Sequence, residues 1–336
     1  HDTLISHNFI PQEEDKMKKS LSVILAALMV ISMFAFTGCG AEKLNFGVGF
    51  SNTISGSDAD GETNGKGQTN VNVAAVLVDK NGKIVKVALD CYQGKVEYTS
   101  AGVAVATQQF KTKYELKEEY GMGGRSEVGE WYEQIDALCG VVIGKTADEV
   151  MALIGEGHGT EEVQTAGCTI TVTELLEAVA NAVKAAAPSE ATKDSNLNLG
   201  FSVSQSLTDA TEEKNGNNQL DVTFAAVASA NGKVQAIYTD CIQAKFTFDT
   251  AGKTLVDPAA AFLTKRELGN DYGMSKIGAK EWFEQADAFE GTCVGKTAAE
   301  ITAFQGADGT VAEEVVTAGC TIHVNALVEA VAKAVQ

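Results

Sequence analysis

Residues 71–90 read VNVAAVLVDKNGKIVKVALD, and this stretch decides the predicted fold. Two predominantly apolar runs flank Asn81-Gly82, a pair suited to the positive φ angles of a tight turn between antiparallel strands. Residues 223–240, TFAAVASANGKVQAIYTD, repeat the pattern around Asn231-Gly232. The sequence therefore predicts two β-hairpins, one in each half of the chain.

Each hairpin is expected to continue into a short third strand and then into helices. The expected third strands are Lys95–Tyr98 and Lys245–Phe248, the helix starts are Glu130 and Glu281, and the caps of the next helices are Thr146 and Thr297. Strands that pair in hairpins and are followed by helices are typical of an α+β fold with an antiparallel sheet.

The last helix of each half carries an apolar stripe. Side chains recur at positions i, i+3, i+4, i+7 and i+11, which lie on one face of an α-helix. They are Val172, Leu175, Leu176, Val179 and Val183 in the first half, and Val324, Leu327, Val328, Val331 and Val335 in the second. We expect this face to pack on the sheet.

The matching halves indicate an internal duplication. LDCYQGKVEYTSAG, from Leu89, corresponds to TDCIQAKFTFDTAG, from Thr239. The predicted organisation is two tandem homologous domains, each a small antiparallel sheet packed with helices. Residues 46–185 are called repeat 1 and residues 197–336 repeat 2, and residues 186–196, which are small and polar, are predicted to be a linker.

The N-terminal residues have the pattern of an export signal. From Met17, two lysines precede an apolar stretch that ends at Gly38-Cys39. This ending resembles the lipobox of bacterial lipoproteins, which implies a signal peptide at 17–38 and acyl chains on Cys39 that hold the exported protein at a membrane surface. A plain transmembrane anchor is the alternative. Residues 1–16 lack an initiating Met and are interpreted as a misassigned extension.

The composition argues against two classes of function. The net charge is −19, from 45 acidic and 26 basic residues, so a nucleic-acid partner is not expected, because phosphate binding needs a concentrated basic surface. The seven cysteines have no Cys-x-x-Cys spacing and the four histidines are scattered, so no metal site is predicted.

A short turn before the last helix is identical in both repeats. It reads Ala166-Gly167-Cys168-Thr169 in repeat 1 and Ala318-Gly319-Cys320-Thr321 in repeat 2. Small residues at the start of a helix let a ligand approach the backbone, and the unpaired amides there favour a phosphate, which the threonine hydroxyl is placed to carry. The alternative is that the threonine caps the helix. However, the capping-box pattern of Thr171 and Glu174 is absent from repeat 2.

At these residues the sequence resembles a known family. The turns are similar to the Ser/Thr-Gly-Ala-Thr turn of FMN-binding domains, in which an FAD-dependent FMN transferase joins the FMN phosphate to the threonine hydroxyl. With the lipobox and the repeated Tyr-Gly-Met, Glu-Trp and Gly-Lys-Thr segments, the layout resembles the flavinylated lipoproteins of extracellular electron transfer in Gram-positive bacteria. The resemblance implies two covalent FMN groups, on Thr169 and Thr321.

The function that this resemblance implies is that of an extracytoplasmic, membrane-tethered electron carrier, not a substrate-converting enzyme. Electrons would arrive from a membrane quinone or dehydrogenase system and leave to extracellular acceptors, and two flavins in tandem would allow relay between the domains. The alternative is an exported lipoprotein without redox chemistry that binds a small ligand or has a structural role at the surface.

Other repeated residues are candidates for the flavin site. Trp131 and Trp282 could flank the isoalloxazine ring or be core aromatics, and Met122 and Met274 could touch the ring or fill a gap. Four glutamines could hydrogen-bond the pyrimidine edge of the flavin or lie in solvent: Gln93, Gln134, Gln243 and Gln285. Two cysteine pairs could be disulfides or buried thiols: Cys91 with Cys168, and Cys241 with Cys320.

Overall fold

The computed structural model describes residues 41–124, 126–278, 280–306 and 309–335. The predicted extension 1–16, the predicted signal peptide 17–38 and the lipidation residue Cys39 lie outside these described residues. Within the described ranges, no helix is both long enough and apolar enough to cross a membrane.

The first sheet is built on the predicted hairpin. Strands β2 (Gly65–Val78) and β3 (Ile84–Tyr98) pair antiparallel across a turn in which Gly82 has a φ of 73°. The third strand expected at Lys95–Tyr98 is not a separate element, because no turn residue interrupts the chain after Asp90 and β3 continues to its end. The remaining strands are β1 (Lys43–Ser57), β4 (Ala104–Val105) and β5 (Ala187–Thr192), in the order β4-β3-β2-β1-β5.

The second sheet repeats the arrangement of strands β1, β2 and β3. It consists of β6 (Asn196–Thr208), β7 (Gly216–Ala230) and β8 (Lys233–Phe248), all antiparallel. Asn231 and Gly232 both have positive φ, 52° and 70°, as a two-residue hairpin turn of this kind requires. The strand expected at Lys245–Phe248 is again the end of one long strand.

The helices of the two repeats correspond closely. Repeat 1 has α1 (Lys113–Leu116), η1 (Lys117–Tyr120), α2 (Trp131–Val142), α3 (Ala147–Met151), α4 (Glu161–Thr165) and α5 (Thr173–Ala185). Repeat 2 has α6 (Lys265–Leu268), η2 (Gly269–Tyr272), η3 (Met274–Lys276), α7 (Trp282–Cys293), α8 (Ala298–Thr302), α9 (Glu313–Ala318) and α10 (Asn325–Ala334). Glu130 and Glu281 form capping boxes at the starts of α2 and α7, and Thr146 and Thr297 cap α3 and α8, as predicted.

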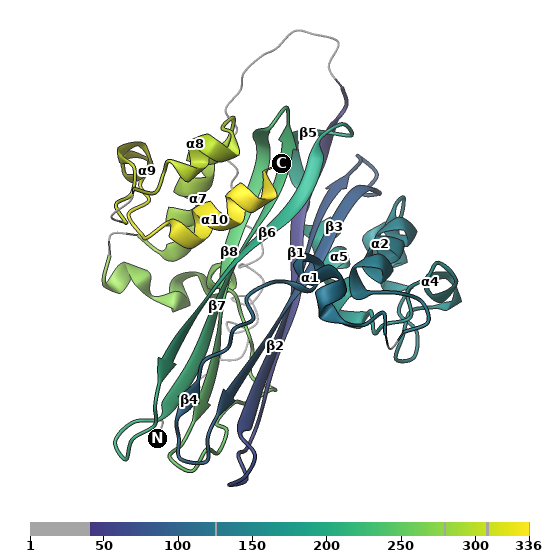
Figure 1. Cartoon of the computed structure of the whole chain (residues 1–336). Helices are drawn as coiled ribbons and strands as arrows, with labels where there is room; N and C mark the ends of the chain where they lie inside the picture. Colours follow the sequence, from purple (N-terminus) through teal and green to yellow (C-terminus); the bar gives the residue numbers. More distant parts are fainter. Residues whose placement is uncertain (1–40, 125, 279, 307–308, 336) are drawn as a thin grey trace, which may run out of the picture. The chain divides into compact units, whose positions relative to one another are not determined.

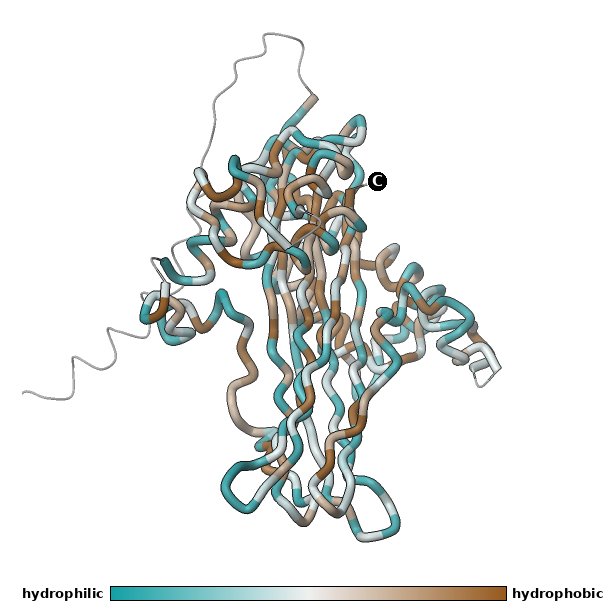
Figure 2. Tube along the Cα trace, turned by 60° about the vertical axis from the view of Figure 1, so that its left-hand side comes forward, coloured by the Kyte–Doolittle hydropathy of each residue, from teal (hydrophilic) through white to brown (hydrophobic). Residues whose placement is uncertain are grey.

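The two sheets pack face to face, and the helices of each repeat cover the outer face of their own sheet (Figure 1). One buried cluster lies between the sheets and includes Tyr92 and Phe224. A second cluster, with Leu89 and Leu176, lies between the first sheet and the helices of repeat 1, and a third, with Val331, is its counterpart in repeat 2. Figure 2 shows hydrophilic residues gathered at the hairpin ends of the strands.

Residues 186–196 are not a separate linker. They contain β5, which pairs with the edge of β1, and the Lys86 ammonium donates to the carbonyl oxygen of Ser195 at 2.5 Å. The small side chains that suggested a linker are compatible with an edge strand. The α+β fold with antiparallel sheets is confirmed. Each repeat has its own sheet and helices, and the two repeats also share the core between their sheets.

Four of the hydrogen bonds between the repeats form two symmetric pairs, in which the same bond is made twice with the roles of the repeats exchanged. The backbone contacts are Ala59 N–H to Gly252 O at 2.9 Å and Ala210 N–H to Gly102 O at 2.7 Å, and the carboxylate contacts are Thr254 N–H to Asp58 and Ala104 N–H to Asp209, both at 2.9 Å. On the symmetry axis, the rings of Tyr98 and Phe248 stack at 4.4 Å. Such reciprocal contacts are the pattern of an isologous interface.

Candidate functional site

The Ala-Gly-Cys-Thr turn ends a short helix and does not begin a long one. In repeat 1, Ala166 is the C-cap of α4, and Gly167 has a φ of 104°, which favours glycine. The Cys168 N–H then donates to the carbonyl oxygen of Val163 at 3.1 Å, and the thiol points into the core. In repeat 2 the turn has the same form at the end of α9, where Gly319 has a φ of 107°.

Two expectations about this turn are therefore wrong. Helix α5 begins at Thr173, so Thr169 is not at a helix N-terminus and the free amides of a first helical turn do not surround it. The N-cap positions of α5 and α10 are Val172 and Val324, without a side-chain cap, so neither a threonine cap nor the capping box of Thr171 forms. Another contact must explain why the threonine is repeated.

That contact is with a buried glutamine on the neighbouring helix. The N–H and the hydroxyl of Thr169 both donate to Oε1 of Gln134, at 2.9 and 3.2 Å. The N–H and the hydroxyl of Thr321 donate in the same way to Oε1 of Gln285, at 2.9 and 3.0 Å. Because the hydroxyl uses its proton in this bond, the lone pairs of its oxygen stay available on the exposed side.

The same glutamine also holds the Tyr-Gly-Met loop. Nε2 of Gln134 lies 3.6 Å from Sδ of Met122, and it donates to Oγ of Ser126 and to the carbonyl oxygen of Gly129, both at 3.2 Å. In repeat 2, Nε2 of Gln285 lies 3.4 Å from Sδ of Met274 and donates to the carbonyl oxygen of Lys280 at 3.2 Å. One amide side chain therefore connects the threonine with the methionine in each repeat.

A carboxylate fixes the backbone of each Tyr-Gly-Met loop. Glu130, the capping residue of α2, accepts from the N–H groups of Met122 and Gly123 at 2.9 and 2.6 Å. Its counterpart Glu281 accepts from the Met274 N–H at 2.9 Å and from Ser275. The hydrogen bond from the Ser275 hydroxyl, followed by those from the backbone, lowers the pKa of Glu281. The loop is thus held in the same position in both repeats.

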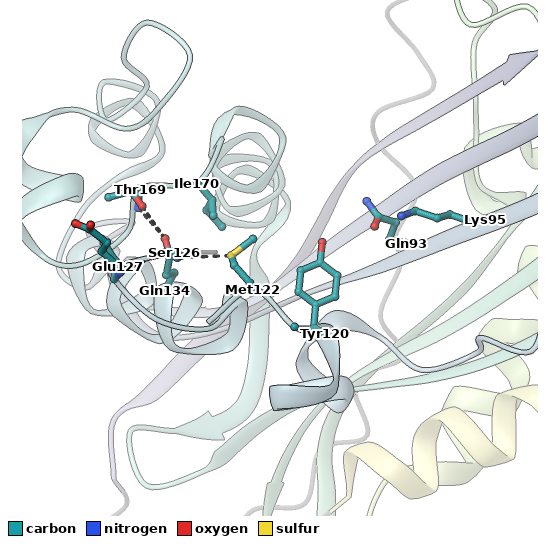
Figure 3. A pocket seen from close by; sticks show the side chains of 11 residues that line it. Gln93, Lys95, Tyr120, Met122, Ser126, Glu127, Gln134, Thr169 and Ile170 are labelled. Carbon is teal, nitrogen blue, oxygen red and sulfur yellow. Dashed lines mark hydrogen bonds between the residues drawn. The ribbon is translucent and has the colours of Figure 1, made fainter. Parts of the chain in front are cut away.

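In repeat 1 these residues line a cavity of about 660 Å³ (Figure 3). Thr169, Gln134 and Met122 lie at one end, and Tyr120 lies toward Gln93 and Lys95 of β3. The remaining lining residues are Gly121, Ser126, Glu127, Val128 and Ile170. Small-ligand sites have volumes of about 300–1,000 Å³, and the volume of this cavity lies in that range. Its lining is largely polar, with Tyr120, Met122, Val128 and Ile170 as the aromatic and apolar side chains.

The structure brings only some of the predicted residues into this cavity. Met122 and Gln93 line it, but Trp131 is 3% exposed and Trp282 is 4% exposed, so each tryptophan is a core aromatic, which was the alternative interpretation. The aromatic side chain at the cavity is Tyr120, which was not predicted. The Lys113 ammonium lies within 5.4 Å of the ring centroids of both Tyr120 and Trp131, so its cation–π contacts connect the tyrosine at the cavity with the buried tryptophan.

The cysteines of the described residues are free thiols. Cys91, Cys168, Cys241 and Cys320 are buried, so the interpretation as buried thiols describes the structure and the disulfide pairing does not. Burial raises the pKa of Cys168 to about 11, which keeps this thiol protonated at neutral pH. Cys168 therefore serves as a small core residue behind the threonine.

Comparison with protein-family models, curated proteins and solved structures found no match. The two repeats provide an internal comparison instead. The connection from threonine through glutamine to methionine is the same in both, although His158 and His323, for example, have no counterpart in the other repeat. What the repeats share is a hydroxyl, fixed by an amide, beside a methionine-containing loop.

Proposed function

We propose that the protein carries FMN, joined through its phosphate to Thr169 in repeat 1 and to Thr321 in repeat 2, and that it transfers electrons. The observation that carries this proposal is the Thr169 hydroxyl, held by Gln134 at one end of a ligand-sized cavity, with the same connection in repeat 2. The resemblance of the two turns to the flavin-attachment turn of FMN-binding domains supplies the identity of the group.

The residues around Thr169 fit such a group. A phosphate on Oγ1 replaces the hydroxyl proton, while the Thr169 N–H keeps its bond to Gln134, so the turn does not have to rearrange. Tyr120 and Met122 offer an aromatic and a thioether surface to a flat ring, and Gln93 and Lys95 offer polar groups to its hydrogen-bonding edge. The bound flavin supplies one- and two-electron transfer, and the protein holds and partly encloses it.

A carrier fits the cavity better than a substrate-converting enzyme does. Among its described lining residues, Glu127 is the one carboxylate, and no His, Cys or Asp is present. The Thr169 hydroxyl contacts the Gln134 amide, which in turn contacts the Met122 thioether, and neither of these groups is an acid or base for catalysis at neutral pH. We further propose that acyl chains on Cys39 anchor the carrier outside the cytoplasm, with a membrane quinone or dehydrogenase system as donor and extracellular acceptors.

The decisive experiment is intact-mass measurement of the protein after co-expression with an FAD-dependent FMN transferase. We expect two additions of FMN less water, of which Thr169→Ala and Thr321→Ala each remove one and the double variant removes both. Thr171→Ala is the matched control, because this exposed threonine lies two residues further on and must leave both additions in place. Unmodified, colourless wild-type protein would contradict the proposal and favour a lipoprotein without redox chemistry.

A further inference from the structure

The two turns differ in the charge that lies against them. In repeat 2, the Lys280 ammonium lies so close to Gly319 that a Cβ added to this glycine would overlap with Nζ. In repeat 1, a Cβ added to Gly167 would have only apolar neighbours, with Val128 Cγ1 and Ala137 Cβ both 3.9 Å away. A cation therefore lies beside the turn of Thr321, and a valine occupies the corresponding place beside the turn of Thr169.

The backbone of Lys280 is held by the same side chain that fixes the threonine. Nε2 of Gln285 donates to the carbonyl oxygen of Lys280 at 3.2 Å, and Oε1 of Gln285 accepts from Thr321. The charge also reaches the turn electrostatically. Burial raises the pKa of the Cys320 thiol, and the positive charge of Lys280 opposes this increase.

Among the described residues, no side chain forms a hydrogen bond or ion pair that neutralises the Lys280 ammonium. Lys296, which follows in the same repeat, differs in this respect, because it pairs with Glu314 at 2.9 Å. In the part of the chain that the structure describes, no carboxylate forms an ion pair with Lys280. A cation that is fixed through its backbone and unpaired at its tip is available to an anion on Thr321.

We propose that Lys280 binds the phosphoryl group that is transferred to Thr321 and makes this threonine the faster acceptor of the two; this inference rests on the proposed function. In the transfer, Thr321 Oγ1 bonds to the phosphorus of the FMN half of FAD, and the bond from that phosphorus to the bridging oxygen breaks. AMP leaves with the electron pair, and the hydroxyl proton is released. The ammonium stabilises the negative charge on the non-bridging phosphoryl oxygens.

The test is the rate of flavin addition at each threonine, measured on unmodified full-length protein with FAD and an FMN transferase. Peptides that contain Thr169 and Thr321 are quantified by mass spectrometry over time. We expect Thr321 to react about two- to fivefold faster than Thr169 at low salt, since an exposed charge contributes modestly, and the difference to shrink at high salt. Lys280→Met should abolish the difference, and Lys280→Arg should retain it.

Two further variants make the test specific. Lys276→Met removes another exposed lysine of the same loop and should leave the ratio unchanged, whereas Val128→Lys places a cation beside the first turn and should accelerate addition at Thr169. If both threonines are modified but Lys280→Met leaves the rate at Thr321 unchanged, the inference is overturned and the proposed function stands. If the wild-type protein is modified at neither threonine, both fail.

Discussion

Gln134 connects three parts of repeat 1 that are distant in the sequence. From helix α2 it accepts from Thr169, and its amide nitrogen reaches Met122 and Ser126 in the Tyr-Gly-Met loop. The side chain is 1% exposed, so these partners replace water completely. A buried amide that loses its partners costs more free energy than the hydrogen bonds add when they form, so the connection is sensitive to substitution.

We therefore predict that Gln134→Leu acts on one site only. It removes the partner of the Thr169 N–H and of the Gly129 carbonyl oxygen, and it should lower the free energy of unfolding by about 1–3 kcal/mol. Flavin addition at Thr169 should fall while addition at Thr321 stays unchanged. Urea unfolding and site-resolved mass spectrometry measure the two effects, with Gln285→Leu as the reciprocal variant. An equal loss of flavin addition at both threonines would contradict the assignment of Gln134 to the site of Thr169 alone.

Asp90 is a buried carboxyl whose ionisation opposes folding. Burial raises its pKa to about 7, although hydrogen bonds from Thr112 and from the N–H groups of Cys91 and Tyr114 favour the charged form. The folded protein thus holds the proton more tightly than the unfolded chain does. The contribution of Asp90 to stability is therefore greatest at low pH and falls as the pH rises from about 4 to about 7.

We predict that Asp90→Asn makes the free energy of unfolding nearly independent of pH above pH 6. The wild-type free energy of unfolding should fall between pH 6 and 7.5, at up to about 1.4 kcal/mol per pH unit, and that of the variant should not. Asp240 has a pKa raised to about 6 by burial, so a slope below pH 6 should remain. Urea unfolding at four pH values is the measurement, and equal slopes for both proteins above pH 6 would refute it.

At the residue level, the sequence was sufficient to predict Thr169 and Met122 as parts of one site, because both occur in segments that are repeated. It also placed Gln134 among the candidates. It could not distinguish Tyr120 from Trp131, since both are repeated as an aromatic residue and their exposure is decided by Lys113 and by packing from other elements. When the burial of a side chain depends on contacts with distant parts of the chain, the neighbouring sequence does not reveal it.

The elements that were not predicted lack a clear apolar period in the sequence. Strand β1 contains three glycines, both β1 and β6 contain many polar residues, and β1 lies directly under helix α5. Helices α4 and α9 have five and six residues, too few for an apolar period, so the Ala-Gly-Cys-Thr turn was assigned to the following helix. The hairpin of β2 and β3 and the apolar stripe of α5 have a clear pattern and were predicted, although the end of β3 and the start of α5 were not.

The glycines that weaken the pattern of β1 also allow α5 to approach it. A Cβ added to Gly49 would overlap with backbone atoms of Ala182 and Ala178, and one added to Gly200 in β6 would overlap with Ala330 of α10. Helix backbone cannot yield as a flexible side chain does. Since only residues 170–172 separate the Ala-Gly-Cys-Thr turn from α5, the fit of this helix on the sheet also positions Thr169.

We predict that Gly49→Ala destabilises the protein by roughly 1–3 kcal/mol, since the added methyl group overpacks the contact between helix and sheet. Gly140→Ala is the matched control. Gly140 lies inside α2 with no atom within 4 Å of an added Cβ, so the substitution should stabilise the protein by about 0.5–1 kcal/mol. Thermal and urea unfolding of both variants give the change in the free energy of unfolding, which should be a decrease for Gly49→Ala and an increase for Gly140→Ala. If Gly49→Ala leaves this free energy unchanged, α5 can shift without cost and the prediction is wrong.

The two repeats behave as the halves of a symmetric dimer joined in one chain. Their reciprocal contacts and the shared core between the sheets fix the two copies back to back. Side chains alternate along β3, so Tyr92 faces the other sheet while Gln93 faces outward into the cavity of repeat 1. In β8, Ile242 takes the inner position in the same way. The two candidate sites thus lie on opposite outer faces.

This arrangement argues against the relay between domains that tandem flavins suggest. Stacked sheets lie about 10 Å apart and a helix layer adds about 10 Å on each side, so Thr169 and Thr321 are separated by on the order of 30 Å. Each proposed flavin is therefore reached by partners from its own outer face, with both sheets between the two sites. We therefore predict that the two flavins react independently.

The measurement is stopped-flow reoxidation of the fully reduced carrier by a soluble acceptor. The wild-type time course should equal the sum of those of the Thr169→Ala and Thr321→Ala variants, each of which keeps one flavin. Spin labels on Thr169→Cys and Thr321→Cys give the separation directly by dipolar spectroscopy, without requiring the flavins. A wild-type course faster than the sum, or a label separation below about 15 Å, would show that the sites communicate and that the back-to-back arrangement does not isolate them.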